Sequence, residues 1–405
     1  MEAAGLASTA GEVNKGFGGW HARRAWLRLL AMSTPSKVPS ARLLVLASKP
    51  AGIAPNQRYR FEQWAPRLRR DHRIELDLLP FESAELSRVL YEPGRYLTKG
   101  LLVTRDFLGR SQAVLQARHY DAVLVVREAA LLGPAIYERL IAWTGKPLIF
   151  DFDDAIWAPG PDINNGVFRH LRFFGKTSSL CRMAAACTVG NAYLAAYARE
   201  RNPRTFIVPS SIELADYPLI PEPASQKPFV VCWTGSASTL AHFEHAHPAL
   251  ERLAQKVPLA VKIICSEPPK VPIAGAEMRF VPWTVEREAE DVGDCHAGIM
   301  PLPDNEFTRG KCALKALQYM ATGRPVVVSP VGVNKDIVKD GENGFLASST
   351  EDFVEALMRL ASSSDLRRSM GAAGRKTVEQ SYSAEVAARM FADVIRNVTS
   401  SRGAS

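Results

Sequence analysis

The stretch that decides the fold is Lys311–Leu346, KCALKALQYMATGRPVVVSPVGVNKDIVKDGENGFL. Its first part has apolar residues at helical spacing, and Gly323 followed by Pro325 is typical of a helix C-terminus. The β-branched run Val326–Val328 then predicts a fully buried parallel strand. The loop Ser329–Val333 follows at the sheet edge where open α/β sheets bind ligands. The stretch therefore predicts a helix, a buried strand and a ligand-facing loop.

Three basic residues, Arg309, Lys311 and Lys315, gather where this helix is expected to begin. Cations at a helix N-terminus oppose the helix dipole, so helix stability does not explain them. Basic side chains beside free backbone N–H groups bind phosphate or diphosphate well. A solvated basic face is the alternative interpretation, but the position of these residues ahead of a strand-end loop favours an anion site.

The same residues resemble the donor-binding half of retaining nucleotide-sugar glycosyltransferases of the GT-B type, families one and four. Those proteins end a helix with the pattern E-A-M-A-x-G-x-P-V-V, which is similar to residues 318–327 here. Their continuation G-x-x-E-x-V-x-D-G-x-x-G-x-L resembles residues 332–346, with Asp336 at the glutamate position. Two glutamates frame the donor helix in the family, and Gly310 and Gln318 stand at those positions here. The resemblance implies that Gln318 bonds a ribose hydroxyl as a neutral amide.

Length and composition predict two globular domains. The chain has 405 residues, of which 47% are hydrophobic and 23% charged, and its formal net charge is +8. That charge suits an anionic ligand or an anionic membrane surface. Six scattered cysteines without a C-x-x-C pair predict buried, reduced thiols. No secretory signal or bilayer-spanning apolar run is evident, so we expect a cytoplasmic protein.

Short apolar runs recur along the chain with helical patterns between most of them, which predicts parallel α/β sheets. Those of the first half are Leu43–Ala47, Ile74–Leu78, Ala122–Val126, Pro147–Phe150, Ala186–Val189 and Phe206–Val208. Those of the second half are Phe229–Trp233, Val261–Cys265, Met278–Val281, Gly298–Pro301, Val326–Val328 and Gly344–Leu346. Such a pattern predicts two facing Rossmann-like domains with a cleft between them. A dehydrogenase is disfavoured because no G-x-G-x-x-G follows a first strand.

We therefore divide the chain into five segments. They are a basic tail (1–39), an acceptor domain (40–215), a linker (216–228), a donor-binding domain (229–380) and a C-terminal helix and tail (381–405). The resemblance implies that the last helix, Ser383 to Val398, crosses back onto the first domain. Within the tail, residues 20–30 are basic and partly amphipathic. They predict either a peripheral contact with the inner face of the membrane or a helix without a partner.

The sharpest acidic cluster is Asp151, Asp153 and Asp154, at the end of an apolar run. Three carboxylates there repel one another unless cations are near. A divalent metal site, the nucleophile of a haloacid-dehalogenase-type phosphatase, and contacts to a sugar or acceptor are the competing interpretations. The phosphatase motif normally opens its fold, whereas three strands precede this cluster, and the GT-B resemblance implies no metal. We therefore assign Asp153 and Asp154 to the catalytic side of the cleft, with Arg127 at a neighbouring strand end.

Other candidate site residues follow strand ends in each half. A proline- and glycine-containing loop after the first strand leads to Arg58 and Arg60, which either hold an anionic acceptor group or carry surface charge. Gly235 and Ser236 form a small turn whose backbone N–H groups would approach a diphosphate, and the family has a similar G-W-x-G-S-x-S-T. Asn191 predicts an N-cap beside the cleft. The H-x-x-H-x-H pattern of His242 to His247 is read as a helix face rather than a metal site.

The resemblance implies a retaining hexosyltransferase that moves a sugar from a nucleotide-diphosphate sugar to a hydroxyl of a glycan or lipid-linked glycan, as in polysaccharide biosynthesis. Gly235, Ser236, Arg309, Lys311 and Lys315 would neutralise the diphosphate leaving group. No metal, cofactor or nucleic-acid partner is expected. Two alternatives remain: a nucleotide-sugar epimerase on the same fold, and a non-catalytic nucleotide-sugar binder, which the missing glutamates keep open.

Overall fold

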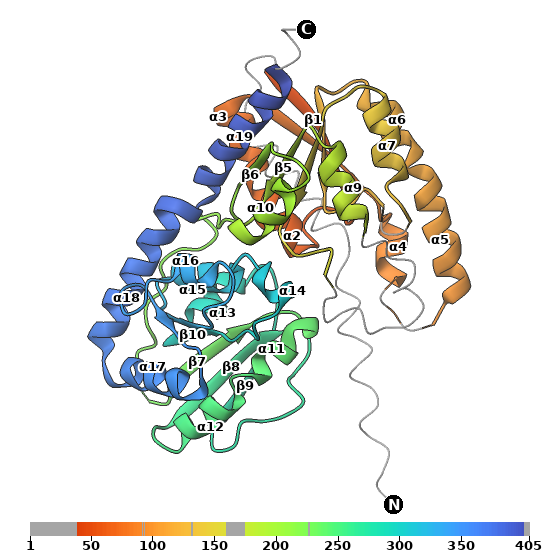
Figure 1. The fold of residues 1–405 in the computed structure, drawn as a ribbon. Helices are drawn as coiled ribbons and strands as arrows, with labels where there is room; N and C mark the ends of the chain where they lie inside the picture. Colours follow the sequence, from red (N-terminus) through yellow and green to blue (C-terminus); the bar gives the residue numbers. More distant parts are fainter. Residues whose placement is uncertain are drawn as a thin grey trace, which may run out of the picture.

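The computed structural model describes residues 39–90, 92, 94–130, 133–158, 175–225 and 227–400. Within them the chain forms two parallel six-stranded sheets, each flanked by helices, and the two α/β domains face each other (Figure 1). Each apolar run that predicted a strand contains one, so the expected fold class is confirmed. Residues 20–30, with the proposed membrane contact, lie outside the described residues.

The first sheet has the strand order β2-β1-β3-β4-β5-β6, and its strand pairs are parallel. Its strands are β1 Ala41–Ala47, β2 Ile74–Pro80, β3 Ala122–Val126, β4 Leu148–Phe152, β5 Ala186–Val189 and β6 Thr205–Ile207. Its helices are α2 Pro55–Gln57, η2 Arg58–Glu62, α3 Gln63–His72, α4 Ala84–Val89, α5 Tyr96–Gly109, α6 Ser111–Ala117, α7 Ile136–Trp143, α9 Gly175–Met183 and α10 Ala192–Arg199. The order of connection reverses between β1 and β3, which places a ligand crevice at the carboxyl ends of these strands.

The second sheet has the order β12-β11-β10-β7-β8-β9, again parallel. Its strands are β7 Phe229–Thr234, β8 Leu259–Cys265, β9 Glu277–Pro282, β10 Ala297–Met300, β11 Val326–Val328 and β12 Phe345–Leu346. Its helices are η4 Ala237–Thr239, α11 Leu240–Glu244, α12 His247–Ala254, α13 Glu288–Gly293, α14 Glu306–Arg309, α15 Leu314–Ala321, α16 Asn334–Ile337, α17 Thr350–Ser362, α18 Ser364–Thr377 and η5 Val378–Tyr382. The order reverses between β7 and β10, as in Rossmann-type nucleotide-binding sheets.

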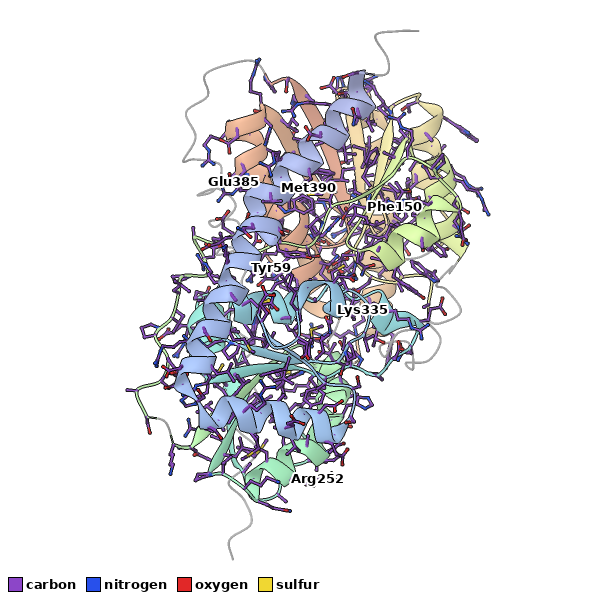
Figure 2. All side chains as sticks on the ribbon, turned by 60° about the vertical axis from the view of Figure 1, so that its left-hand side comes forward. Tyr59, Phe150, Arg252, Lys335, Glu385 and Met390 are labelled. Carbon is purple, nitrogen blue, oxygen red and sulfur yellow. The ribbon has the colours of Figure 1, made fainter. Side chains whose placement is uncertain are left out.

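The last helix, α19 Ala384–Ser400, leaves the second domain and covers one face of the first sheet (Figures 1 and 2). Its apolar stripe packs on α3, where the ring centroids of Phe391 and Trp64 lie 5.4 Å apart. Ser383 accepts a hydrogen bond from the Val386 N–H at 3.4 Å, which confirms it as the cap. The expected crossing helix is therefore present, and it ties the two domains together.

Candidate active site

The loop after β7 lies at the switch point of the second sheet. A Cβ at residue 235 would lie 2.5 Å from the Trp233 ring, so only glycine fits there. The backbone N–H of Gly235 donates to the Ile264 carbonyl at 3.0 Å, and that of Ser236 to the Thr239 hydroxyl at 3.2 Å. Both N–H groups are thus used within the domain, and their approach to a diphosphate stays a prediction. What the loop presents is the exposed Ser236 side chain.

Lys315 stands on α15 with its ammonium nitrogen 4.6 Å from the centre of the Trp233 ring. It makes no hydrogen bond or ion pair with the described residues. Burial, with repulsion from Lys311, lowers the pKa of Lys315 to about 7. A lysine that is costly to charge and lacks a carboxylate partner is well placed to receive an anion.

His242 lies close enough to Lys315 and Lys311 to be affected by their charges. Its side chain is 6% exposed, and its Nδ1 has no hydrogen-bond partner. Burial, followed by repulsion from Lys315 and Lys311, lowers the pKa of His242 to about 4. A buried ring nitrogen without a partner is uncommon in proteins and indicates room for a ligand or water. Lys315 and Lys311 therefore form an electropositive end of the crevice, with His242 beside them as a neutral imidazole.

The three basic residues that sequence reasoning grouped together have different surroundings. Arg309 ends the short helix α14 and pairs with Asp304 at 2.6 Å on the surface. Lys311 reaches across the domain boundary to Asp154 at 3.0 Å. The left-handed residue Ala313, with φ 55°, separates them from α15. Of the three, Lys315 alone remains free for an anion among the described residues.

The acidic cluster is divided into two parts. Arg127 Nε donates to Asp153 at 2.8 Å and its Nη2 donates to Asp154 at 2.6 Å. Burial, with the neighbouring charge of Asp154, raises the pKa of Asp153. Burial acts in the same direction on Asp154, but Lys311 and Arg127 outweigh it and lower the Asp154 pKa. The pair thus contains one carboxylate held ionised and one that takes up a proton more readily.

Asp151, the third carboxylate of the cluster, forms a buried ion pair with Arg60. The Arg60 side chain is 0% exposed, and its Nε donates to Asp151 at 3.1 Å. The Thr188 hydroxyl donates to the same carboxylate at 2.6 Å. Arg60 therefore does not face the cleft, and its assignment to the acceptor side is wrong. Its charge is used to neutralise a buried aspartate in the first domain.

Arg58 and Gln318 meet in a buried network between the domains. The Gln318 amide nitrogen lies 2.9 Å from the hydroxyl oxygen of Tyr59 and 2.8 Å from that of Tyr217. It also lies 2.9 Å from Glu288 Oε1, and Arg58 forms an ion pair with the same carboxylate. Although burial raises the pKa of Glu288, Arg58 and the surrounding donors lower it below its usual value. Neither residue is free for a ligand here, so the expectation that Gln318 bonds a ribose hydroxyl is not met.

Gly310, at the other family glutamate position, also lies against the first domain. A Cβ there would be 2.6 Å from the backbone nitrogen of Ala155. Asn191, the N-cap of α10 as predicted, donates to the carbonyls of Gly310 at 3.1 Å and Lys311 at 3.0 Å. Both positions are thus occupied by contacts between the domains. Figure 2 shows Tyr59 at the same boundary. Sequence reasoning missed Tyr59, Tyr217 and Glu288 because no local motif marks them.

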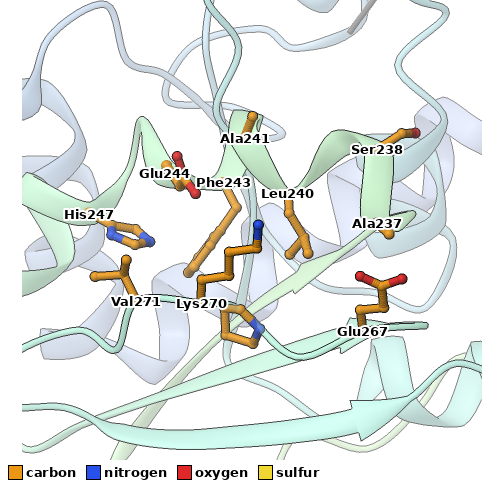
Figure 3. Close-up of a pocket in the computed structure, with 11 residues that line it drawn as sticks. Ala237, Ser238, Leu240, Ala241, Phe243, Glu244, His247, Glu267, Lys270 and Val271 are labelled. Atoms are coloured by element: carbon orange, nitrogen blue, oxygen red, sulfur yellow. The ribbon is translucent and has the colours of Figure 1, made fainter. Parts of the chain in front are cut away.

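A cavity of about 370 Å³ lies elsewhere on the second domain, between α11 and the segment after β8 (Figure 3). Leu240, Phe243 and Val271 line it, with Glu267 and Lys270 at its polar side. Neither Lys311 nor Lys315 lines it, so it is separate from the electropositive region. Across the described ranges, no three His, Cys, Asp or Glu side chains are grouped to hold a metal ion, and no helix is long and apolar enough to cross a membrane.

Residues 228–363 match the family model described as glycosyl transferases group 1. No curated protein matches the sequence. Sucrose-phosphate synthase from Thermosynechococcus elongatus superposes with a TM-score of 0.63 at 14% identity, over 89% of this chain and 100% of that one. HepE from Anabaena, solved with UDP-glucose, superposes with a TM-score of 0.60 at 12% identity, over 90% of this chain and 100% of that one. A glycosyltransferase from Rickettsia africae superposes with a TM-score of 0.61 at 10% identity, over 89% of this chain and 99% of that one.

The two facing sheets and these structural similarities show that the chain has the GT-B fold. Within this fold, the match to the glycosyl transferases group 1 model covers residues 228–363 of the second domain.

Proposed function

We propose that the protein transfers a hexose from a nucleotide-diphosphate sugar to a hydroxyl of a glycan or lipid-linked glycan, with retention of configuration. The observation that carries the proposal is the Lys315 ammonium, unpaired among the described residues, at the switch point of a domain that matches the group 1 model. The donor diphosphate would lie beside Lys315, with the exposed Ser236 side chain and His242 around it.

The chemistry of the leaving group supports this placement. Negative charge grows on the diphosphate as the glycosidic bond to the donor breaks, so a fixed cation stabilises the transition state more than the ground state. Lys315 would gain a proton when the diphosphate binds, since a nearby anion raises a lysine pKa. With cationic side chains in this role, the proposal includes no metal or cofactor.

The acceptor would enter from the first domain, beside Asp153 and Asp154. The ion pair of Lys311 with Asp154 connects this acidic pair to the donor side at 3.0 Å. The raised pKa of Asp153 suits a carboxylate that accepts a proton from a hydroxyl. Arg127 would orient both carboxylates, as a positioning residue.

The test is donor binding followed by turnover. Isothermal titration with UDP, GDP and their sugars is compared for the wild type, Lys315→Ala and Arg309→Ala. We expect Lys315→Ala to weaken nucleotide binding at least tenfold, because a charge-assisted contact is lost, while Arg309→Ala binds normally. Equal binding by the wild type and Lys315→Ala would contradict the donor site.

Nucleotide release then separates the three functions. A transferase releases the nucleotide faster when a glycan acceptor is added. An epimerase would consume the donor sugar without an acceptor, and a binder would hold the donor without turnover. Either of these two results would replace the proposed activity.

A further inference from the structure

An apolar stripe runs along the outer side of the first domain, on α5 and α6 (Figure 1). The two helices follow one another with a turn at Arg110, whose backbone angles stay in the helical region, and we call the pair the rod. Four leucines project from it: Leu97 is 87% exposed, Leu101 73%, Leu108 64% and Leu115 65%. Large apolar side chains that are exposed in a contiguous set mark an interaction surface more often than single ones do.

The spacing places these leucines on one side of the rod. At about 100° per residue, positions 97, 101, 108 and 115 fall within roughly 40° of one another, over a length of about 27 Å. The opposite side packs on the core, where the ring centroids of Phe107 and Tyr137 lie 5.0 Å apart. The rod is also anchored by the buried Arg110, which donates to the Ala129 carbonyl at 2.6 Å. The stripe therefore faces away from the core, although α5 itself has no fully buried residue.

The charges around the stripe are mainly positive. Residues 84–119 contain three acidic residues, Glu85, Glu92 and Asp106, and six arginines and lysines, of which the buried Arg110 does not reach the surface. The Asp106 side chain is 6% exposed and accepts a hydrogen bond from the Ser83 N–H at 2.8 Å. Glu85 pairs with Arg105 on the surface. Lys99 and Arg118 remain beside the stripe without a carboxylate partner among the described residues.

We propose that this rod docks the protein on an anionic lipid surface. The four leucines would enter the interface between headgroups and acyl chains, and the cationic side chains would contact the headgroups. A second copy of the chain is a poorer occupant, because pairing two such rods would bring cationic surfaces together. The net charge of +8 acts in the same direction. The docking does not depend on the proposed transfer reaction.

The test is flotation of the full-length protein with vesicles of phosphatidylcholine alone and with added phosphatidylglycerol. We expect binding to the anionic vesicles that weakens with salt. The double variant Leu101→Gln/Leu108→Gln is expected to lower the partition coefficient by about tenfold or more, since two apolar side chains no longer insert. The matched control is Leu219→Gln, a leucine of the linker that is 61% exposed and should bind as the wild type does.

Other results would overturn the proposal. One is unchanged vesicle binding by the double variant when its thermal midpoint matches the wild type. Another is loss of binding in Trp20→Ser/Trp26→Ser with no loss in the double variant, which would assign docking to the tail. A third is a wild-type dimer in analytical ultracentrifugation that the double variant dissociates, which would assign the stripe to a second copy.

Discussion

At the scale of single residues, Lys315 is the most informative side chain of the site. Its pKa of about 7 lies below the usual value because burial and Lys311 disfavour the charged form. A diphosphate favours that form, so binding is accompanied by proton uptake above pH 7. We therefore expect UDP affinity to be full below pH 7 and to fall as the pH rises above it. Calorimetry in buffers of different ionisation enthalpy measures the proton uptake directly.

The control for this pH dependence is Lys315→Arg, because arginine stays charged throughout the range. It should bind UDP with little change between pH 7 and pH 9. An equal fall in affinity for the wild type and this variant would assign the titration to another group.

At the scale of elements, α15 shows why glutamine stands where the family has glutamate. Gln318 lies 2.9 Å from Glu288 Oε1, in a buried position. A second carboxylate there would be buried beside the first, which raises its pKa. We expect Gln318→Glu to lose about 1–3 kcal/mol of stability at neutral pH.

The sign of the pH effect follows from the raised pKa. The folded Gln318→Glu protein would bind more protons than the unfolded chain, so its deficit should be small near pH 4 and grow as the pH rises. Thermal unfolding at several pH values measures this stability deficit. The control is Gln112→Glu, on the exposed side of α6. A deficit that is no larger at pH 8 than at pH 5 would contradict the assignment.

At the scale of the whole molecule, the two domains approach each other closely at Gly310. A Cβ on Gly310 would lie 2.6 Å from the Ala155 nitrogen, although its φ of −76° suits any residue. We expect Gly310→Ala to push the domains apart while both sheets stay folded. Sugar transfer should then fall strongly, because misplacement by about 1 Å can cost about a hundredfold in rate.

Small-angle scattering and the transfer rate check this prediction. The control is Gly100→Ala on α5, where a Cβ meets nothing within 4 Å. This variant should leave the scattering profile and the transfer rate unchanged and stabilise α5 slightly. Normal transfer by Gly310→Ala would show that the boundary tolerates the methyl group.

The sequence alone determined the strands, the two domains and the last helix, because these depend on local patterns, while the crossing of that helix onto the first domain was implied by the resemblance. The strand Val326–Val328 is fully buried, as its β-branched residues predicted. Gly323 ends α15 because glycine readily adopts a positive φ, which is 79° here. Helix boundaries were less certain: α15 begins only at Leu314, after the left-handed Ala313. The presence of basic and acidic side chains at the strand ends was also predictable.

Only the tertiary structure decided which of those side chains are free. Lys311 and Asp154 are 157 positions apart in the sequence and 3.0 Å apart in space. Gln318 is taken by Tyr59 and Tyr217, and Arg60 by Asp151. A charge or amide can be read from the sequence, but its availability depends on partners that folding brings from distant parts of the chain. Lys315 is left unpaired among the described residues for the same reason, since no carboxylate is brought near it.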